Sequence, residues 1–334
     1  MKCDFCEWHC DLSEDQFGFC RMYYSKNNEI KERFPDKWSS VSVSRVESVP
    51  FYHAYPGAKS LVIGTSGCNF RCRYCSNGFL ACEPPEDVQG QMFHLTGDEL
   101  VKTALKMNCH NIIFNVNEPA VSLLSLQQVS EAAKRECVPM GCLTNGFTSE
   151  ASTEKMASVF QFMNISLKGF SSKFYRDYAS VKSVDPVLRN IRTLAGMSHI
   201  EITTPIIQGV NDHEIDAIAD FIADVDPEIP WHVFRLLPEH DMIESDYPKI
   251  DAINAQLETA RKKLPYLYFH NFVGSDWVNT TCPSCGDDVI ERFSLGCGGD
   301  KLDRYLCDNA RCSKCGQSIK ILGTNIPWNH REAV

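Results

Sequence analysis

Short apolar runs alternate with amphipathic stretches through the middle of the chain. The runs predict buried strands at 61–65, 111–115, 139–143, 162–167, 199–206 and 231–236. The stretches between and after them predict helices at about 96–107, 124–137, 151–159, 171–180, 184–196, 211–224 and 247–263. Alternating strands and helices imply right-handed crossovers and a mainly parallel sheet. Six such units are fewer than the eight of a closed barrel, so we expect an α/β fold with an open, partial (β/α)6 barrel.

Polar residues follow each predicted strand. The first strand runs into a glycine-rich cysteine loop at 64–78, and the next two end at 117–119 and 144–146. The last three carry polar residues at 166–170, 203–204 and 231–232. Because ligands bind at the carboxyl ends of the strands in open parallel sheets, these segments are expected to meet around one site.

Three cysteines in the loop after the first predicted strand have the spacing C-x3-C-x2-C. Cys68, Cys72 and Cys75 can hold three corners of a cubane iron–sulfur cluster, which normally takes four cysteines. The fourth iron then lacks a protein ligand, and an open metal position is what catalysis requires. The alternatives are a structural zinc knuckle or three unrelated thiols. The preceding strand, the flanking glycines and Tyr74 before the last cysteine favour the cluster.

Composition and charge narrow the classes of partner. The chain has 334 residues, of which 43% are hydrophobic and 23% charged, as in soluble globular proteins. A formal net charge of −10 argues against nucleic acid as the main partner, because phosphate binding needs a basic face. Neither a signal-like apolar segment near Met1 nor a membrane-length apolar run occurs, so we expect a cytoplasmic protein without a membrane partner.

Seventeen cysteines in a cytoplasmic protein favour metal sites over disulfides. Four of them, Cys3, Cys6, Cys10 and Cys20, lie in a predicted N-terminal knuckle and connector at 1–50. They can close around one metal or hold a small cluster, and the identity of the metal stays open. A loose set of reduced thiols is the alternative. Outside the clusters, Cys82, Cys109, Cys137 and Cys142 are explained as single thiols.

Two C-x2-C-Gly knuckles lie near the C-terminus, in a module expected at 276–334. Cys282 with Cys285 and Cys312 with Cys315 predict a four-cysteine zinc ribbon whose metal supplies much of the folding free energy. Cys297 and Cys307 lie between the knuckles as spare thiols or as ligands of an auxiliary iron–sulfur cluster. The spacing of the knuckles favours zinc.

Residues 51–275 resemble the pyruvate formate-lyase activating enzyme branch of radical S-adenosylmethionine (SAM) enzymes. Within that branch, they are most similar to the group encoded beside Memo-type proteins, known as the AmmeMemoRadiSam system. Besides the cysteine loop, the resemblance rests on the segments 51–57, 117–119, 167–170, 209–212 and 230–232. The cysteine groups at both ends also match the group, so the resemblance covers nearly the whole chain.

The resemblance implies an oxidoreductase that binds SAM at the open iron of a [4Fe-4S] cluster on Cys68, Cys72 and Cys75. An electron from the cluster would cleave SAM to a 5′-deoxyadenosyl radical, which abstracts hydrogen from a protein or peptide. A flavodoxin or ferredoxin is the implied electron donor. The implied SAM contacts are backbone near Tyr74 for the adenine, Asn117 and Glu118 for the amino group, Lys168 for the carboxylate or ribose, and Thr203 and His232.

One position departs from the branch. The activating enzymes carry Asp-x-Lys on the fourth strand, where this chain has Ser166-Leu167-Lys168. A hydroxyl is a poorer ligand for a hard cation than a carboxylate, so a monovalent cation beside SAM at Ser166 is left open. The departure weakens a strict glycyl-radical activase function and leaves SAM cleavage intact. The alternatives are a radical SAM enzyme that modifies a small metabolite, and a metal-bearing interaction protein without turnover.

Overall fold

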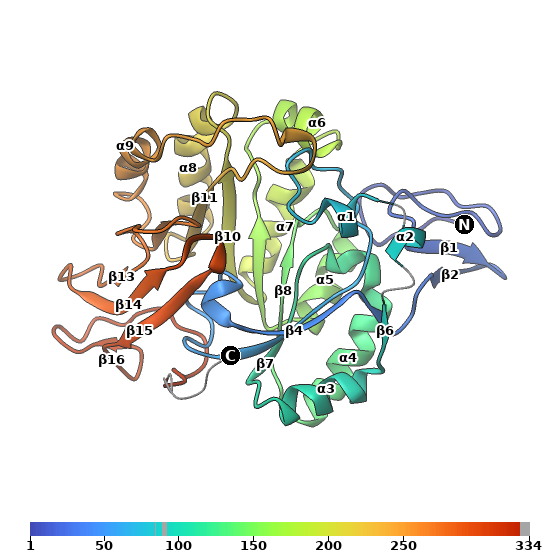
Figure 1. Cartoon of the computed structure of the whole chain (residues 1–334), viewed down its shortest axis with the longest axis horizontal. Coiled ribbons are helices and arrows are strands. Elements are labelled where there is room, and N and C mark those ends of the chain that lie inside the picture. Colours follow the sequence, from blue (N-terminus) through green and yellow to red (C-terminus); the bar gives the residue numbers. More distant parts are fainter. Residues whose placement is uncertain (84, 89–91, 328–334) are drawn as a thin grey trace.

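The computed structural model describes residues 1–83, 85–88 and 92–327, and one eight-stranded sheet organises them (Figure 1). Its strands, in spatial order, are β12 (Leu267–His270), β11 (Trp231–Arg235), β10 (His199–Ile206), β9 (Phe162–Ser166), β8 (Met140–Thr144), β7 (Asn111–Phe114), β5 (Lys59–Gly64) and β4 (Ser40–Arg45). From β5 to β12 all neighbours are parallel and follow the chain order. In this order β12 and β4 are the two ends of the sheet, so the barrel is open, as predicted.

Helices form the crossovers between the parallel strands. They are α3 (Gly97–Lys106), α4 (Leu123–Arg135), α5 (Glu150–Val159), α6 (Ser172–Ala179), α7 (Asp185–Ala195), α8 (Ile215–Val225) and α9 (Ile250–Ala260), preceded by the short α1 (Gly78–Ala81) and α2 (Pro85–Val88). All seven predicted helices are present with small shifts at their ends. Thr96 caps α3 through a reciprocal capping box with Glu99, which satisfies backbone donors at the start of the helix.

Two strands of the sheet were not predicted from the sequence. β4 pairs antiparallel with β5, and its alternation of serine and valine, typical of a strand with one polar face, differs from the apolar runs that predicted the other strands. β12 has only four residues, although all of them are buried, and it extends the parallel sheet beyond β11. The partial barrel therefore has one more parallel strand than the six that were predicted.

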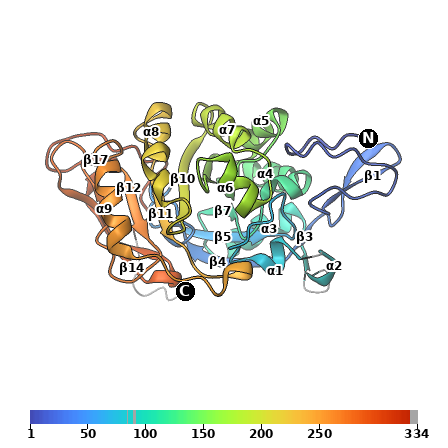
Figure 2. The ribbon, with the colours of Figure 1, turned by 90° about the horizontal axis from the view of Figure 1, so that it is seen from above.

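Smaller sheets lie at the two ends of the large one. Near the N-terminus are the hairpin of β1 (Tyr23–Lys26) and β2 (Glu29–Glu32) and the pair β3 (Lys37–Trp38) and β6 (Phe93–His94). Near the C-terminus are β13 (Thr280–Thr281), β14 (Asp288–Ser294), β15 (Asp300–Tyr305), β16 (Cys307–Asp308) and β17 (Arg311–Cys312). Figures 1 and 2 show the β1–β2 hairpin and the β13–β17 segment at opposite ends of the molecule. Residues 328–334 of the predicted C-terminal module lie outside the described residues.

The core lies between the large sheet and its helices. Each of five consecutive parallel strands contributes a side chain that is at most 1% exposed: Phe114, Met140, Ile165, Ile202 and Trp231. Truncating a buried side chain of this size costs about 2–5 kcal/mol of the free energy of unfolding. The closely packed core therefore acts as a rigid frame. This frame holds the carboxyl ends of the strands, and the loops that follow them, in fixed positions.

Candidate functional site

A cavity of about 370 Å³ opens at the carboxyl ends of the parallel strands. We call it the central cavity, and its volume is in the range of small-molecule sites. Nine of the ten residues predicted for the cluster and SAM line it: Cys68, Cys72, Tyr74, Cys75, Asn117, Glu118, Ser166, Lys168 and Thr203. They come from the loop after β5, the loop after β7, the end of β9 and the segment that follows it, and the middle of β10. The structure therefore brings these side chains together, and the tenth, His232, lies elsewhere.

The Asn117 side chain holds the start of the cysteine loop. Its Nδ2 lies 3.0 Å from Thr65 Oγ1, 3.1 Å from the Ser66 carbonyl oxygen and 3.0 Å from the Gly67 carbonyl oxygen. Its Oδ1 accepts a hydrogen bond of 3.0 Å from the Thr65 backbone N–H. These contacts occupy the two amide hydrogens and one lone pair of the oxygen. Asn117 therefore fixes the path of the loop that carries the three cysteines.

Glu118 places a buried carboxylate beside the cavity. Its two oxygens accept hydrogen bonds from the Ala120 N–H at 3.1 Å, the Thr144 hydroxyl at 2.8 Å and the Asn145 N–H at 2.7 Å. Burial raises the pKa of Glu118 to about 7, although these hydrogen bonds favour the charged form. A carboxylate has about four acceptor positions, so room for one further donor remains. The arrangement suits a cationic group bound in the cavity.

Lys168 and Tyr74 contribute polar groups that have no partner in the described part of the chain. Lys168 Nζ lies 5.8 Å from the centre of the Tyr74 ring, and no described carboxylate lies within ion-pair distance of it. The buried Tyr74 hydroxyl has no hydrogen-bond partner among the described residues. Burial raises the pKa of the Cys72 thiol to about 11, while the Lys168 charge acts in the opposite direction. An unpaired ammonium and an unpaired hydroxyl beside three thiols fit a ligand with both charged and polar groups.

Cys82 is a neighbour of the central thiols that the sequence did not indicate. The interaction of its thiol with that of Cys75 is the main cause that lowers the pKa of the Cys75 thiol. Cys82 is the residue after α1, the one-turn helix that follows the cysteine loop. The helical turn brings Cys82 back toward the loop, whereas its distance in sequence suggested an isolated thiol.

The structure does not bring His232 to the central cavity. Its ring is fully buried, with Nε2 2.6 Å from Glu201 Oε2 and Nδ1 3.0 Å from His270 Nε2. The cavity is lined instead by Phe234, two residues further along β11. Side chains two residues apart share one face of a strand, so His232 lies one layer deeper in the barrel. The sequence predicted a SAM contact at this position of β11, and the structure places its side chain below the lining of the cavity.

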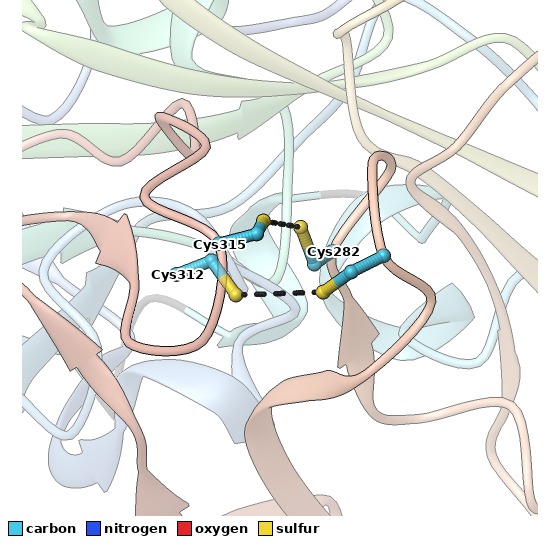
Figure 3. A group of neighbouring side chains, drawn as sticks. Cys282, Cys312 and Cys315 are labelled. Atoms are coloured by element: carbon cyan, nitrogen blue, oxygen red, sulfur yellow. Dashed lines mark hydrogen bonds between the residues drawn. The ribbon is translucent and has the colours of Figure 1, made fainter.

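Four thiols near the C-terminus face one another across two loops (Figure 3). Cys282 Sγ lies 3.5 Å from Cys315 Sγ, and Cys285 Sγ lies 3.7 Å from Cys312 Sγ. All four sulfurs lie within 4.8 Å of one another. Zinc–sulfur bonds of about 2.3 Å in a tetrahedron place sulfurs about 3.8 Å apart, so this group, the C-terminal quartet, has the size of a single-ion site.

The remaining cysteines of interest lie apart from that quartet. Cys297 is exposed, and Cys307 pairs with Cys312 across the β16–β17 ladder but is not a member of the four-sulfur group. Cys3, Cys6, Cys10 and Cys20 line a small separate cavity near the N-terminus. None of the described helices is long and apolar enough to cross a membrane.

Comparison with known proteins identifies the domain around the central cavity. Residues 62–222, from β5 into α8, match the family model of the Radical SAM superfamily. This part of the chain is therefore a radical SAM domain, and the protein is an enzyme. The thiols and charged groups of the central cavity fit the [4Fe-4S] cluster and SAM that the domain implies.

Three relatives in sequence differ in how much of the chain they match. An uncharacterized protein of Methanocaldococcus jannaschii, MJ0808, is 27% identical over 327 residues, which is 96% of each chain. A probable GTP 3′,8-cyclase of Methanosarcina mazei is 26% identical over 168 residues, 47% of this chain and 48% of the relative. The isethionate sulfite-lyase activating enzyme of Oleidesulfovibrio alaskensis is 28% identical over 138 residues, 40% of this chain and 42% of the relative. The chain thus spans less than half the length of the two relatives with a named activity.

Proposed function

We propose that this protein reductively cleaves SAM and uses the resulting 5′-deoxyadenosyl radical to abstract hydrogen from a protein substrate. One observation carries the proposal: three thiols, a buried carboxylate and an unpaired ammonium border the same cavity of a radical SAM domain. The thiols suit an iron–sulfur cluster with one open iron. The Glu118 carboxylate suits the ammonium group of an amino acid, and the Lys168 ammonium suits its carboxylate. The methionine part of SAM carries both of these groups.

The roles of the side chains follow from their positions. Cys68, Cys72 and Cys75 would hold the [4Fe-4S] cluster, which supplies the electron for cleavage when bound. Glu118 would accept a hydrogen bond from the SAM ammonium, and Lys168 would donate one to its carboxylate, because charge-assisted bonds are strong where water is excluded. Tyr74, Ser166 and Thr203 would contact SAM directly. Asn117 would act indirectly, because it holds the cysteine loop in position.

The substrate is proposed from the relatives and from one edge of the cavity. The isethionate sulfite-lyase activating enzyme has, by its name, another enzyme as its target. At the edge formed by the end of β11 and the residues after it, the cavity is lined by Arg235, Leu236 and Leu237. A cation next to two leucines suits a polypeptide better than a compact polar metabolite. We further propose a flavodoxin or ferredoxin as electron donor and structural zinc in the C-terminal quartet.

The match to a GTP 3′,8-cyclase favours a second candidate, a small metabolite as substrate. The two candidates differ in where deuterium would appear. With a protein substrate that carries deuterium at carbon, 5′-deoxyadenosine would gain deuterium from the protein. With a nucleotide substrate, it would gain deuterium from the nucleotide, and no mass change would occur in any protein.

Anaerobic reconstitution tests the proposed reaction. Protein loaded with iron and sulfide, then given SAM and dithionite, should form 5′-deoxyadenosine and methionine in equal amounts, measured by liquid chromatography and mass spectrometry. Cys72→Ala should reduce this product at least a thousandfold (about 4 kcal/mol). Cys137→Ala, at an exposed position outside the cavity, is the matched control and should retain it. Absence of product from wild-type protein with a complete cluster would contradict the proposal.

A further inference from the structure

Four cysteines near the N-terminus surround a space of their own. Cys3, Cys6, Cys10 and Cys20, called the N-terminal quartet below, line an enclosed cavity of about 10 Å³. Aromatic side chains shield it: the Phe5 and Tyr23 rings stack with centroids 4.1 Å apart, and Phe19 belongs to the lining. An enclosed, sulfur-lined and aromatic-shielded space is a suitable environment for a metal centre.

The N-terminal quartet is wider than a zinc site. In the described residues, the C-terminal quartet is the one group of potential metal ligands whose ligand atoms all lie within 4.8 Å of one another. The N-terminal quartet is not such a group, and its thiols line a cavity of about 10 Å³ together with neighbouring aromatic and small residues. A single ion with bonds of about 2.3 Å would leave no such space. A [4Fe-4S] cubane, which takes four cysteine thiolates, separates the sulfurs more widely and fills the centre.

Backbone amides point at each sulfur of the N-terminal quartet. The Phe19 N–H donates to Cys10 Sγ over 3.4 Å. The N–H groups of Phe5, Trp8, Met22 and Tyr23 act on the other three sulfurs and lower the pKa of those thiols, although burial raises it more. Such bonds stabilise thiolate sulfur and tune the potential of a cluster. These amides offset part of the cost of burying thiolate sulfur, so the site suits thiolates that a metal holds in their charged form.

The N-terminal quartet touches the central cysteine loop. The side chain of Asn69 hydrogen-bonds with the Cys6 thiol, and its Oδ1 lies 3.8 Å from Cys68 Sγ. Trp8 Nε1 donates to the Asn69 carbonyl oxygen over 2.8 Å, which fixes the contact. A single residue thus separates a thiol of one cysteine set from a thiol of the other.

Glycine at position 67 permits this close approach. Gly67 has a φ of +77°, and a Cβ there would lie 2.9 Å from the Cys20 carbonyl oxygen and 2.6 Å from Met22 Cγ. Nearby, Arg71 Nη2 donates to the Phe19 carbonyl oxygen over 3.1 Å. The segment that closes the N-terminal quartet is therefore locked against the loop of the central thiols.

The other side of the N-terminal quartet approaches the surface. Cys3 and Cys20 are buried, while Cys6 and Cys10 are only half-buried. The segment lies next to the β1–β2 hairpin, at the end of the molecule opposite the C-terminal quartet (Figure 1). One edge of the site thus faces the central loop, and another is near enough to solvent for a partner protein.

We propose that the N-terminal quartet holds a second [4Fe-4S] cluster that passes electrons to the cluster on Cys68, Cys72 and Cys75. The relay rests on the proposed function. A reduced ferredoxin or flavodoxin gives one electron to the N-terminal cluster, and the central cluster then receives it. The electron finally enters SAM, where the bond from sulfur to C5′ breaks to give neutral methionine and the 5′-deoxyadenosyl radical. One electron enters, one bond breaks, and no proton is consumed.

Iron content tests the site independently of SAM cleavage. The triple variant C68S/C72S/C75S, reconstituted anaerobically, should retain about four irons per chain. Its electron paramagnetic resonance signal after reduction should not change on addition of SAM. Adding Cys3→Ser and Cys20→Ser to the triple variant should remove that iron. A triple variant with no iron, or with zinc in its place, would overturn the site even if wild-type protein cleaves SAM.

Reduction kinetics test the relay. In Cys10→Ser, the rate at which reduced ferredoxin reduces the central cluster should fall at least tenfold relative to the rate with dithionite. Freeze-quenched resonance spectra of the SAM-sensitive signal give both rates, so turnover is not required. Cys137→Ser is the matched control and should leave the ratio of the two rates at the wild-type value. An unchanged ratio in Cys10→Ser would overturn the relay while leaving the proposed reaction in place.

Discussion

The central thiols and the C-terminal quartet use the same ligand type in opposite arrangements. In the C-terminal quartet, four sulfurs face one another within 4.8 Å. The three central sulfurs instead border a cavity of about 370 Å³ that also contains Glu118 and Lys168. The first arrangement suits a single ion enclosed by four ligands, and the second would leave room for a ligand beside a metal. The difference indicates a structural role for one region and a catalytic role for the other.

Local sequence alone does not produce this difference. Cys72 with Cys75 and Cys282 with Cys285 share the spacing C-x2-C. The C-terminal pair meets a second knuckle, formed by Cys312 and Cys315, across a short gap. Among the described residues, the central thiols belong to no four-sulfur group of that size, although Cys82 neighbours Cys75, and polar strand ends border their cavity. Whether a two-cysteine knuckle forms a closed or an open metal site therefore depends on the residues that face it in the folded protein.

The largest effect on stability is expected at the closed site. Cys285→Ser removes one of the four proposed zinc ligands and should release about one zinc per chain. Because a small module depends on its metal for folding, the temperature of unfolding should fall by about 10 °C. Zinc analysis and differential scanning calorimetry measure the two changes.

A comparison variant makes this test specific. Cys297→Ser changes an exposed cysteine of the same module outside the quartet and should retain both zinc and stability. SAM affinity of Cys285→Ser, measured at a temperature where the protein is folded, should equal that of wild type. Weakened SAM binding in this variant would show that the two regions do not have separate roles.

The sequence predicted the frame of the catalytic region better than the direction of its side chains. All six predicted strands are present, because apolar runs mark most buried parallel strands, although β10 also carries buried polar residues such as Glu201 and Thr204. The orientation of Asn117 toward Thr65 was not predictable, because it depends on the path of the loop that it holds. The depth of His232 was missed because its partner Glu201 comes from another strand. The local pattern of apolar and polar residues shows on which face of a strand a side chain lies. How deep that side chain lies in the barrel depends on packing against residues far away in the sequence.

A smaller effect is expected at the open site. Lys168→Ala removes the proposed partner of the SAM carboxylate and should weaken SAM binding about tenfold, or about 1.4 kcal/mol. The temperature of unfolding should stay at the wild-type value, because no described carboxylate pairs with Lys168 in the folded protein. Calorimetric titration of the anaerobic, cluster-loaded protein measures the affinity. Equal SAM affinity in the variant and wild type would remove Lys168 from the site.

Buried histidines join the two regions. His232 contacts His270, whose Nδ1 lies 2.6 Å from Asp300 Oδ2 at the start of β15. His53 Nδ1 lies 2.7 Å from the carbonyl oxygen of Lys320, and its Nε2 lies 2.6 Å from the Tyr268 hydroxyl. These contacts link the barrel to the chain around the C-terminal quartet, and they include the most deeply buried titratable groups of the junction.

A pH-dependent effect, a weakening of this junction in acid, is expected as well. Burial lowers the pKa of His53 to about 3 and that of His232 to about 4, from an ordinary 6.5. Between these values the unfolded chain binds more protons than the folded one, so this stability is present above pH 6.5 and is lost as pH falls. At pH 5.5 the loss is about 1.4 kcal/mol per histidine, or a few degrees in the temperature of unfolding. The glutamine in His232→Gln cannot take up a proton in this range, so the pH dependence of the unfolding temperature should become about half as steep. An unchanged slope would place the acid-sensitive group elsewhere, for example at the thiolates of the C-terminal quartet.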